Sequence, residues 1–164
     1  GQLVALVARA FGATQITLGD PVAFPRRFAV EMGADAAIDP ADPASGPQAL
    51  DLAGGGFDCV FEAAGSTKAL ILALNVVRRG GTIVQVGTLP AEVPLPANLI
   101  MAKELILAGS FRFAHVFPMA LQFVASRRIN VAPLISQTFP FDETLQAMAR
   151  AVRKDNVIKI QIES

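Results

Sequence analysis

The stretch FDCVFEAAGSTKALILALNVVRRGGTIVQVG, residues 57–87, decides the fold class. Its apolar start, Phe57 to Glu62, predicts a strand buried on both faces. Ser66 predicts a helix cap whose hydroxyl accepts a backbone N–H, and the helix should run from Thr67 to Arg79. Gly80-Gly81 ends this helix, and Thr82 to Val86 predicts the next strand. Strand, helix and strand at this spacing predict a parallel βαβ unit.

The same alternation continues on both sides of this unit. It predicts an α/β fold, a doubly wound parallel sheet with helices on both faces. The connections are marked by glycine and proline, as in DPADPAS at residues 39–45. Helices are predicted over residues 1–11, 26–32, 48–52, 67–79, 99–102, 114–126 and 142–152, and strands over 15–18, 36–38, 57–62, 82–86, 104–108, 134–138 and 157–162.

Composition limits the partners of this chain. Its 164 residues carry 14 basic and 14 acidic side chains, so the net charge is zero and attraction to nucleic acid or to an anionic membrane is not expected. The longest apolar runs are shorter than the roughly 20 residues of a membrane span. One cysteine, Cys59, excludes an internal disulfide framework and suits a reducing compartment. No leader pattern is seen, and the cytoplasm is the expected location.

Asp20 is the most informative polar residue. Parallel α/β folds bind ligands beyond the carboxyl ends of their strands, and Asp20 follows the predicted strand 15–18. In dinucleotide folds an acid at this place accepts the ribose hydroxyls and repels a 2′-phosphate, which favours NAD over NADP. Counting back through the preceding helix makes Gly1 a candidate for the last glycine of GxGxxG. Alternatively, Asp20 caps the next helix, or binds a ribose in a methyltransferase.

Four segments carry a resemblance to a known family. The chain resembles the zinc-type medium-chain alcohol and polyol dehydrogenases, and within them the sorbitol dehydrogenase and L-idonate 5-dehydrogenase branch. GSFRF at Gly109 to Phe113 is the most suggestive piece. The segments are FDCVFEAAG at 57–65, RRGGTIVQVGTLP at 78–90, KELILAGSFRF at 103–113 and INVAPLISQTFPFDETLQAM at 129–148.

The resemblance implies a Rossmann-like domain that binds NAD beside a separate zinc-bearing catalytic domain. Asp20 would bind the adenosine ribose. Arg112 would hold a phosphate or the polar end of a substrate. The other implied cofactor residues follow the last three strands of the sheet: Ala63, Ala64 and Gly65 under the cofactor, Val86, Gly87 and Thr88 beside the nicotinamide riboside, and Ser110, Phe111 and Arg112 at the nicotinamide end.

The chain also departs from this pattern. Pro25 stands where polyol dehydrogenases of this branch often carry an arginine, so Arg26 is a further cofactor candidate and some use of NADP stays open. The first strand and the first two fingerprint glycines are missing. We expect residues 1–113 to form an incomplete cofactor domain and residues 114–164 to return to an absent catalytic domain, which would hold the zinc. Cys59 is expected to be a buried inert thiol and His115 a surface residue, so neither catalytic nor metal-binding residues are expected in this chain.

The expected function is NAD-dependent oxidation of a secondary alcohol, polyol or sugar acid, such as L-idonate, to the ketone. This chain would supply the cofactor-binding half and be inactive alone. The alternatives are a non-catalytic nucleotide-binding module and a zinc-free, NADP-dependent enzyme like the quinone reductases. The resemblance further implies a homo-oligomer that pairs along Leu105 to Ala108, at the edge of the sheet.

Overall fold

The computed structural model describes residues 1–113, 115–153 and 155–164. Ala114, where the predicted C-terminal segment begins, lies outside this described part. The chain divides into two compact units. The first unit contains Gly1 and residues 40–113, and the second contains residues 2–39 and 115–164. In both units every strand pair is parallel.

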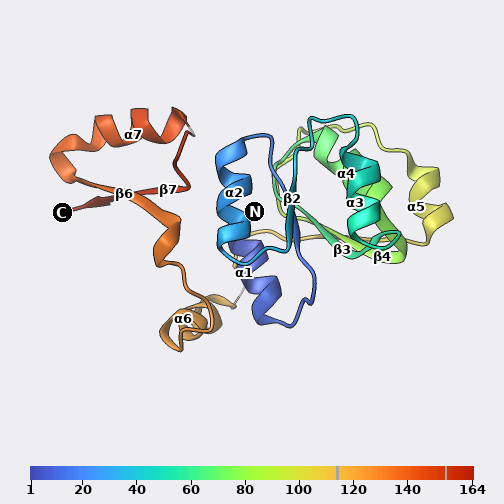
Figure 1. Cartoon of the computed structure of the whole chain (residues 1–164), viewed down its shortest axis with the longest axis horizontal. Helices are drawn as coiled ribbons and strands as arrows, with labels where there is room; N and C mark the ends of the chain where they lie inside the picture. The colour runs from blue at the N-terminus through green and yellow to red at the C-terminus, as the bar shows by residue number, and fades with distance from the viewer. Residues whose placement is uncertain (114, 154) are drawn as a thin grey trace. The chain divides into compact units, whose positions relative to one another are not determined.

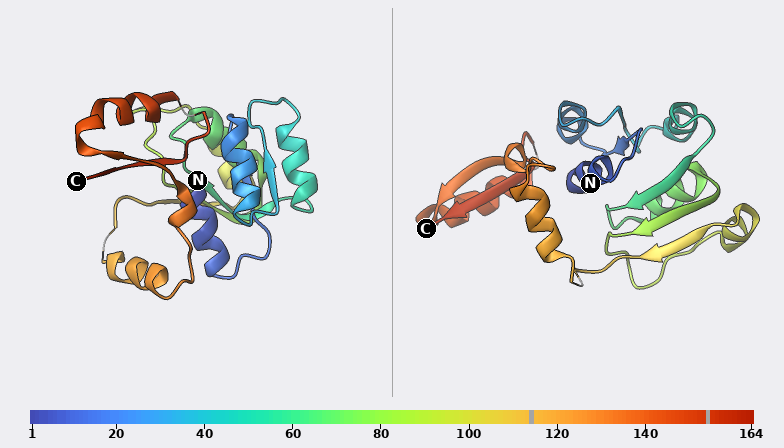
Figure 2. Two further views of the ribbon diagram at one scale, coloured as in Figure 1. Left: turned by 60° about the vertical axis from the view of Figure 1, so that its left-hand side comes forward. Right: turned by 90° about the horizontal axis from the view of Figure 1, so that it is seen from below.

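The first unit is a three-stranded sheet of order β3-β4-β5 with helices packed on it (Figure 1). Figure 2 shows its strands, green to yellow, lying side by side. The helix α4 packs against β3 and β4, and α5 packs against β4. In chain order the elements are α3 (Ser45–Leu52), β3 (Phe57–Glu62), α4 (Thr67–Val76), β4 (Val77–Gln85), α5 (Ala97–Lys103) and β5 (Ile106–Gly109).

The core of this unit lies between α4 and the sheet. Leu70 and Leu74 of α4 are almost fully buried against Val77 and Ile83 of β4. Each such side chain contributes about 1.5–3 kcal/mol by leaving water. The prediction that the strand 57–62 is buried on both faces is wrong, because Asp58, Cys59 and Phe61 are exposed. Within this unit, α4 packs against β3.

The predicted helix 67–79 ends earlier, at Val76. Val77 already pairs with Phe57 in the sheet, so α4 passes into β4 with no residue between them. Lys103 Nζ donates hydrogen bonds to three carbonyls at this junction, those of Leu74, Asn75 and Val77, at 2.8–2.9 Å. These are carbonyls that a helix end otherwise leaves unpaired. The Gly80-Gly81 pair forms a bulge in β4 instead of a turn before it.

The second unit contains two separate strand pairs, β1-β2 and β6-β7. Leu18 of β1 is buried with Ala29 of α2 and Ala34. The helix α7 packs on β6 and β7. In chain order the elements are α1 (Gln2–Ala10), β1 (Thr17–Gly19), α2 (Ala23–Glu31), β2 (Ala36–Ile38), α6 (Phe117–Ala125), the 3₁₀ turns η1 (Ala132–Leu134) and η2 (Phe141–Glu143) around β6 (Ile135–Pro140), α7 (Thr144–Arg153) and β7 (Lys159–Glu163).

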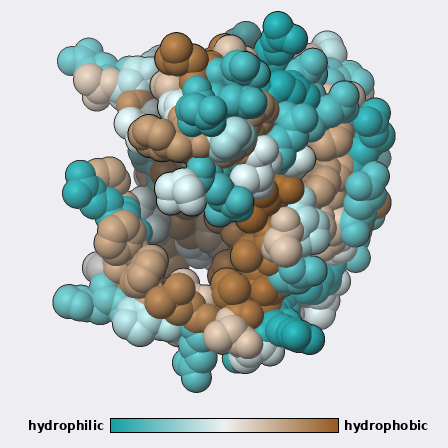
Figure 3. Space-filling view, turned by 90° about the vertical axis from the view of Figure 1, so that its left-hand side faces the viewer, coloured by the Kyte–Doolittle hydropathy of each residue, from teal (hydrophilic) through white to brown (hydrophobic). Residues whose placement is uncertain are grey.

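One stripe of α7 is apolar and exposed. Leu145, Met148 and Val152, spaced three and four residues apart, have exposed fractions of 82%, 61% and 79%. Figure 3 faces the side on which α7 lies in Figure 1 and shows hydrophobic side chains among hydrophilic ones at the surface. Apolar residues at this spacing form one side of a helix, and such a side is normally covered.

The element types agree with the sequence, and the predicted α/β class with parallel sheets is confirmed. The strands 36–38 and 57–62 have the predicted bounds. The strand β4 begins five residues before the predicted residue 82, and the other predicted elements differ by at most three residues at either end. The two short 3₁₀ turns were not predicted. No helix within the described residues is long and apolar enough to cross a membrane.

Candidate functional site

Three turns follow the carboxyl ends of β3, β4 and β5. Because these strands are parallel and adjacent, their ends lie at one edge of the sheet. The Ser110 N–H donates to the Gln85 carbonyl at 2.9 Å, which connects the ends of β5 and β4. The turns are residues 63–66, 86–88 and 110–112. Apart from Gly1, they contain every cofactor residue that the sequence predicts in the first unit.

The first turn is fixed by Glu62, the last residue of β3. Its Oε1 accepts hydrogen bonds from the backbone N–H groups of Ala64 at 2.9 Å, Gly65 at 2.8 Å and Ser66 at 3.3 Å. Ser66 is the cap of α4 as predicted, but its hydroxyl makes no capping hydrogen bond. The carboxylate of Glu62 instead accepts the N–H groups that lead into the helix, and it does so as a charged acceptor.

The first two turns approach each other so closely that glycine is required in both. A Cβ on Gly87 would lie 2.2 Å from the Gly65 nitrogen and 2.6 Å from Oε2 of Glu62. A Cβ on Gly65, whose φ is +67°, would lie 2.5 Å from the Thr88 carbonyl oxygen. Any side chain at either position would force the backbone apart. The structure therefore brings the predicted groups 63–65 and 86–88 together.

Glu62 was not predicted as a site residue. It is 2% exposed, whereas Ala64 and Val86, two of the turn residues whose N–H groups it accepts, are exposed. The available signal was an acidic residue at the end of an apolar strand, immediately before the small residues of the turn. A buried acid requires hydrogen-bond partners, and the backbone N–H groups of a following turn are the nearest ones.

The third turn presents a cation and an aromatic ring to solvent. Phe111 is 79% exposed, and the Arg112 guanidinium carbon lies 5.0 Å from the centre of its ring. Arg112 has a φ of +61°, in the left-handed region that non-glycine residues seldom occupy. Strain of this kind is found at functional sites more often than elsewhere.

In the second unit, Asp20 follows β1 and is half-buried. Its Oδ1 accepts the N–H of Val22 at 2.8 Å, but Val22 is the N-cap of α2 and no side chain caps this helix, so the capping role considered from sequence is not observed. Arg26 donates to the Asp20 carbonyl at 2.6 Å and pairs with the Asp39 carboxylate at 3.0 Å. The charge of Arg26 is thus balanced by Asp39. Gly1 directly precedes α1.

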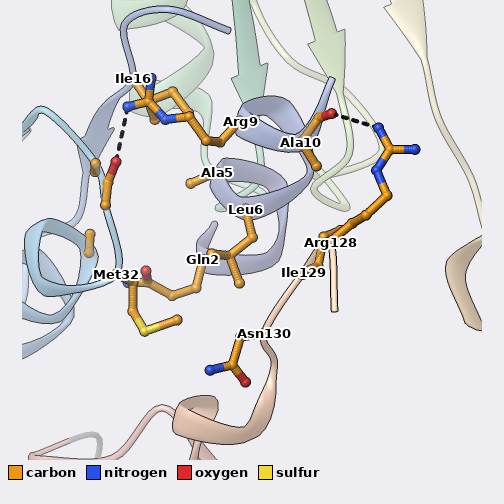
Figure 4. A pocket seen from close by; sticks show the side chains of 13 residues that line it. Gln2, Ala5, Leu6, Arg9, Ala10, Ile16, Met32, Arg128, Ile129 and Asn130 are labelled. Atoms are coloured by element: carbon orange, nitrogen blue, oxygen red, sulfur yellow. Dashed lines mark hydrogen bonds between the residues drawn. The ribbon is translucent and has the colours of Figure 1, made fainter. Parts of the chain in front are cut away.

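The cavity in the second unit is a different place. It measures about 250 Å³ and lies between α1, α2 and residues 128–130 (Figure 4). Among the residues that line it, Arg9 donates to the Gly33 carbonyl at 3.0 Å, and Arg128 donates to the Ala10 carbonyl at 3.3 Å. None of the predicted cofactor residues lines it.

Cysteine and histidine do not form a metal site within the described residues, where no group of three metal-ligating side chains occurs. The prediction that Cys59 is buried is wrong, because it lies on the exposed face of β3. Partial desolvation and the neighbouring Asp58 carboxylate raise the pKa of the Cys59 thiol, which disfavours the thiolate that zinc requires. His115 is exposed, as predicted.

Comparison with known proteins identifies the family. Residues 1–126 match the family described as zinc-binding dehydrogenase. The chain belongs to this family. As a zinc-binding dehydrogenase chain, it is 32% identical over 162 residues to the L-idonate 5-dehydrogenase (NAD(P)(+)) of Escherichia coli (strain K12), covering 99% of this chain and 47% of that protein. It is 30% identical over 168 residues to the sorbitol dehydrogenase of Rattus norvegicus, covering 99% of this chain and 46% of that protein.

Solved structures give the same result. The crystal structure of the L-idonate 5-dehydrogenase from Escherichia coli superposes with a TM-score of 0.89 at 30% identity, over 99% of this dehydrogenase chain and 46% of that one. The predicted resemblance to zinc-type polyol dehydrogenases and to their Rossmann-like domain is confirmed. The chain spans about half the length of the relatives that it matches.

Proposed function

We propose that the protein carrying this chain oxidises a secondary alcohol, a polyol or a sugar acid such as L-idonate to the ketone, with NAD as hydride acceptor. The names of the relatives support this substrate class. The observation that carries the proposal is the group of small residues at the ends of β3 and β4, where two glycines face backbone atoms at distances that admit no side chain. These two turns therefore pack backbone to backbone at the carboxyl ends of parallel strands, which is where α/β folds bind dinucleotides.

The residues fit NAD at both of its ends. Asp20 would accept the adenosine ribose hydroxyls, and its carboxylate would repel a 2′-phosphate. Arg26 would do little to attract that phosphate, because Asp39 already balances its charge. Ala63, Ala64 and Gly65 would carry the cofactor over β3. Gly1 would be the last glycine of the fingerprint, which permits close packing of the helix on the strand.

The nicotinamide end would be held by the turns after β4 and β5. Val86, Gly87 and Thr88 would flank the nicotinamide riboside, and Ser110, Phe111 and Arg112 would close its far side. When bound, NAD accepts a hydride at its nicotinamide ring. This chain's contribution is to orient that ring toward the alcohol.

The zinc of the family does not fit this chain, because the described residues contain no suitable ligand set and the Cys59 pKa is raised. As expected from sequence, we propose that residues 1–113 belong to the cofactor-binding domain and residues 114–164 to the catalytic domain. We also propose a homo-oligomer that pairs along β5, where Ile106 and Leu107 are 60% and 41% exposed.

The proposal is tested with the protein at its full natural length. Asp20→Asn should raise the KM for NAD about tenfold or more, because two hydrogen bonds to the ribose lose their charged acceptor. Asp51→Asn, a change at an exposed acid of α3, is the control and should leave this KM unchanged. Turnover that is better with NADP than with NAD, or no change in the Asp20 variant, would refute the assignment.

A further inference from the structure

Glu62 contacts two of the turns proposed to bind the cofactor, the turn 63–66 that would carry it over β3 and the turn 86–88 beside the nicotinamide riboside. Through its side chain it accepts three N–H groups of the first turn, from Ala64, Gly65 and Ser66. Through its main-chain carbonyl it accepts the N–H groups of Val86 at 2.8 Å and Gly87 at 2.9 Å in the second turn. One residue therefore determines the separation of the two turns.

The second carboxylate oxygen shows how tight this arrangement is. Oε2 of Glu62 is buried and has no hydrogen-bond partner among the described residues. It lies against Gly87, at the place where a side chain of residue 87 would be. A buried carboxylate oxygen without a partner costs free energy. A neutral or apolar residue would avoid this cost but could not accept three N–H groups with a charged oxygen.

We propose that Glu62 is a positioning residue for the nicotinamide end of the cofactor. It touches no cofactor atom, because it is covered by the turns that it holds. Its carboxylate fixes the turn 63–66 and thereby the position of Gly65 against Gly87 and Thr88. The inference rests on the proposed function, since it assumes that these turns bind the dinucleotide.

A positioning role and a general stabilising role lead to different results with two ligands. NADH spans both ends of the cofactor site, whereas ADP-ribose lacks the nicotinamide. If Glu62 only stabilises the fold, its removal lowers the affinity for both ligands by the same factor. If Glu62 positions the turns beneath the nicotinamide end, its removal lowers the affinity for NADH far more than the affinity for ADP-ribose.

The experiment measures both affinities by calorimetry on the full-length protein, with variants Glu62→Ala and Glu62→Gln. Glu62→Ala should raise the Kd for NADH about tenfold and the Kd for ADP-ribose less than about twofold. Glu62→Gln keeps an acceptor without its charge and should lie between Glu62→Ala and the unsubstituted protein, and it serves alone if the alanine variant does not fold. The control is Asp58→Ala, on the same strand, where an exposed carboxylate pairs with Arg78.

The outcomes separate the two proposals. Equal loss of both ligands in the Glu62 variants, or no loss of NADH, overturns the positioning role while the unsubstituted protein still binds NADH. If the unsubstituted full-length protein binds neither ligand, the proposed function itself fails, and this inference fails with it.

Discussion

At the scale of single residues, the charge of Arg26 is balanced by a neighbouring carboxylate. Arg26 pairs with Asp39 at 3.0 Å, in a half-buried setting. We predict that Asp39→Asn raises the ratio of kcat/KM for NADP to that for NAD several-fold, because the guanidinium loses its anion and can meet a 2′-phosphate. Steady-state kinetics with both cofactors measure this ratio. Adding Arg26→Gln should abolish the gain, and a gain that persists would contradict this explanation.

Gly87 allows a second prediction at the same scale. Gly87→Ala places a methyl group 2.2 Å from the Gly65 nitrogen, so the turns must separate. We expect a loss of about 2–4 kcal/mol in the free energy of unfolding, measured by urea denaturation. Gly109→Ala is the matched control, since no atom lies within 4 Å of a Cβ there. If both substitutions lowered the free energy of unfolding equally, the close approach of the two turns at Gly87 would not be the cause of the loss.

Sequence predicted the turn residues better than the residue that holds them. The small residues after an apolar strand marked 63–65 as a candidate cofactor surface, and the structure joins them to 86–88. The role of Glu62 depends on where three backbone N–H groups point, which no pattern of residue types encodes. The exposure of Cys59 could not be predicted either. An apolar strand has the same residue pattern whether one or both of its faces are covered by other elements of its unit.

At the scale of elements, Lys103 joins the end of α5 to the end of α4. Its Nζ donates to three carbonyls, those of Leu74, Asn75 and Val77. We predict that Lys103→Met lowers the free energy of unfolding by about 1–3 kcal/mol, since the substitution removes the cation and leaves these carbonyls without it. Thermal or urea unfolding measures the loss. Lys68→Met, at an exposed position of α4, should change little, and a similar loss there would contradict the role of Lys103.

Element types followed from the sequence because glycine, proline and apolar periodicity act locally. The end of α4 could not be predicted from the sequence. Residue 77 can either extend the helix or pair with Phe57 in the sheet, and the pairing depends on a strand that lies 20 residues earlier in the chain. Helix propensity favoured continuation through Arg79. The hydrogen bonds of Lys103, which lies 26 residues beyond Val77, stabilise the earlier end.

At the scale of the whole molecule, two ion pairs make stability depend on acidity. The N–H of Ile16 and the side chain of Arg9 lower the pKa of Asp35, and Arg150 lowers the pKa of Asp155. A carboxylate with a lowered pKa in the folded state stabilises the fold above its unfolded-state pKa, near 3.8, and this contribution is lost as the pH falls through the folded-state pKa.

We therefore predict that Asp35→Asn lowers the Tm at pH 7 and has a smaller effect at a pH well below 3.8, where more of the carboxylate is protonated. Thermal unfolding of both proteins across this range is the measurement. The difference should also shrink in high salt, because both partners are partly exposed. A difference in Tm that is the same at both pH values would show that charge is not its cause.

The direct passage of α4 into β4 has a consequence for how chains of this kind can vary in length. An inserted or deleted residue at the 76–77 junction would rotate either the buried side of α4 or the alternation of β4, and with it the turn that carries Gly87. The connection between β4 and α5 has no such restriction, since residues 86–96 form no helix or strand. Over evolutionary time, insertions and deletions in this part of the protein should therefore collect in the proline-rich connection and be excluded from the junction.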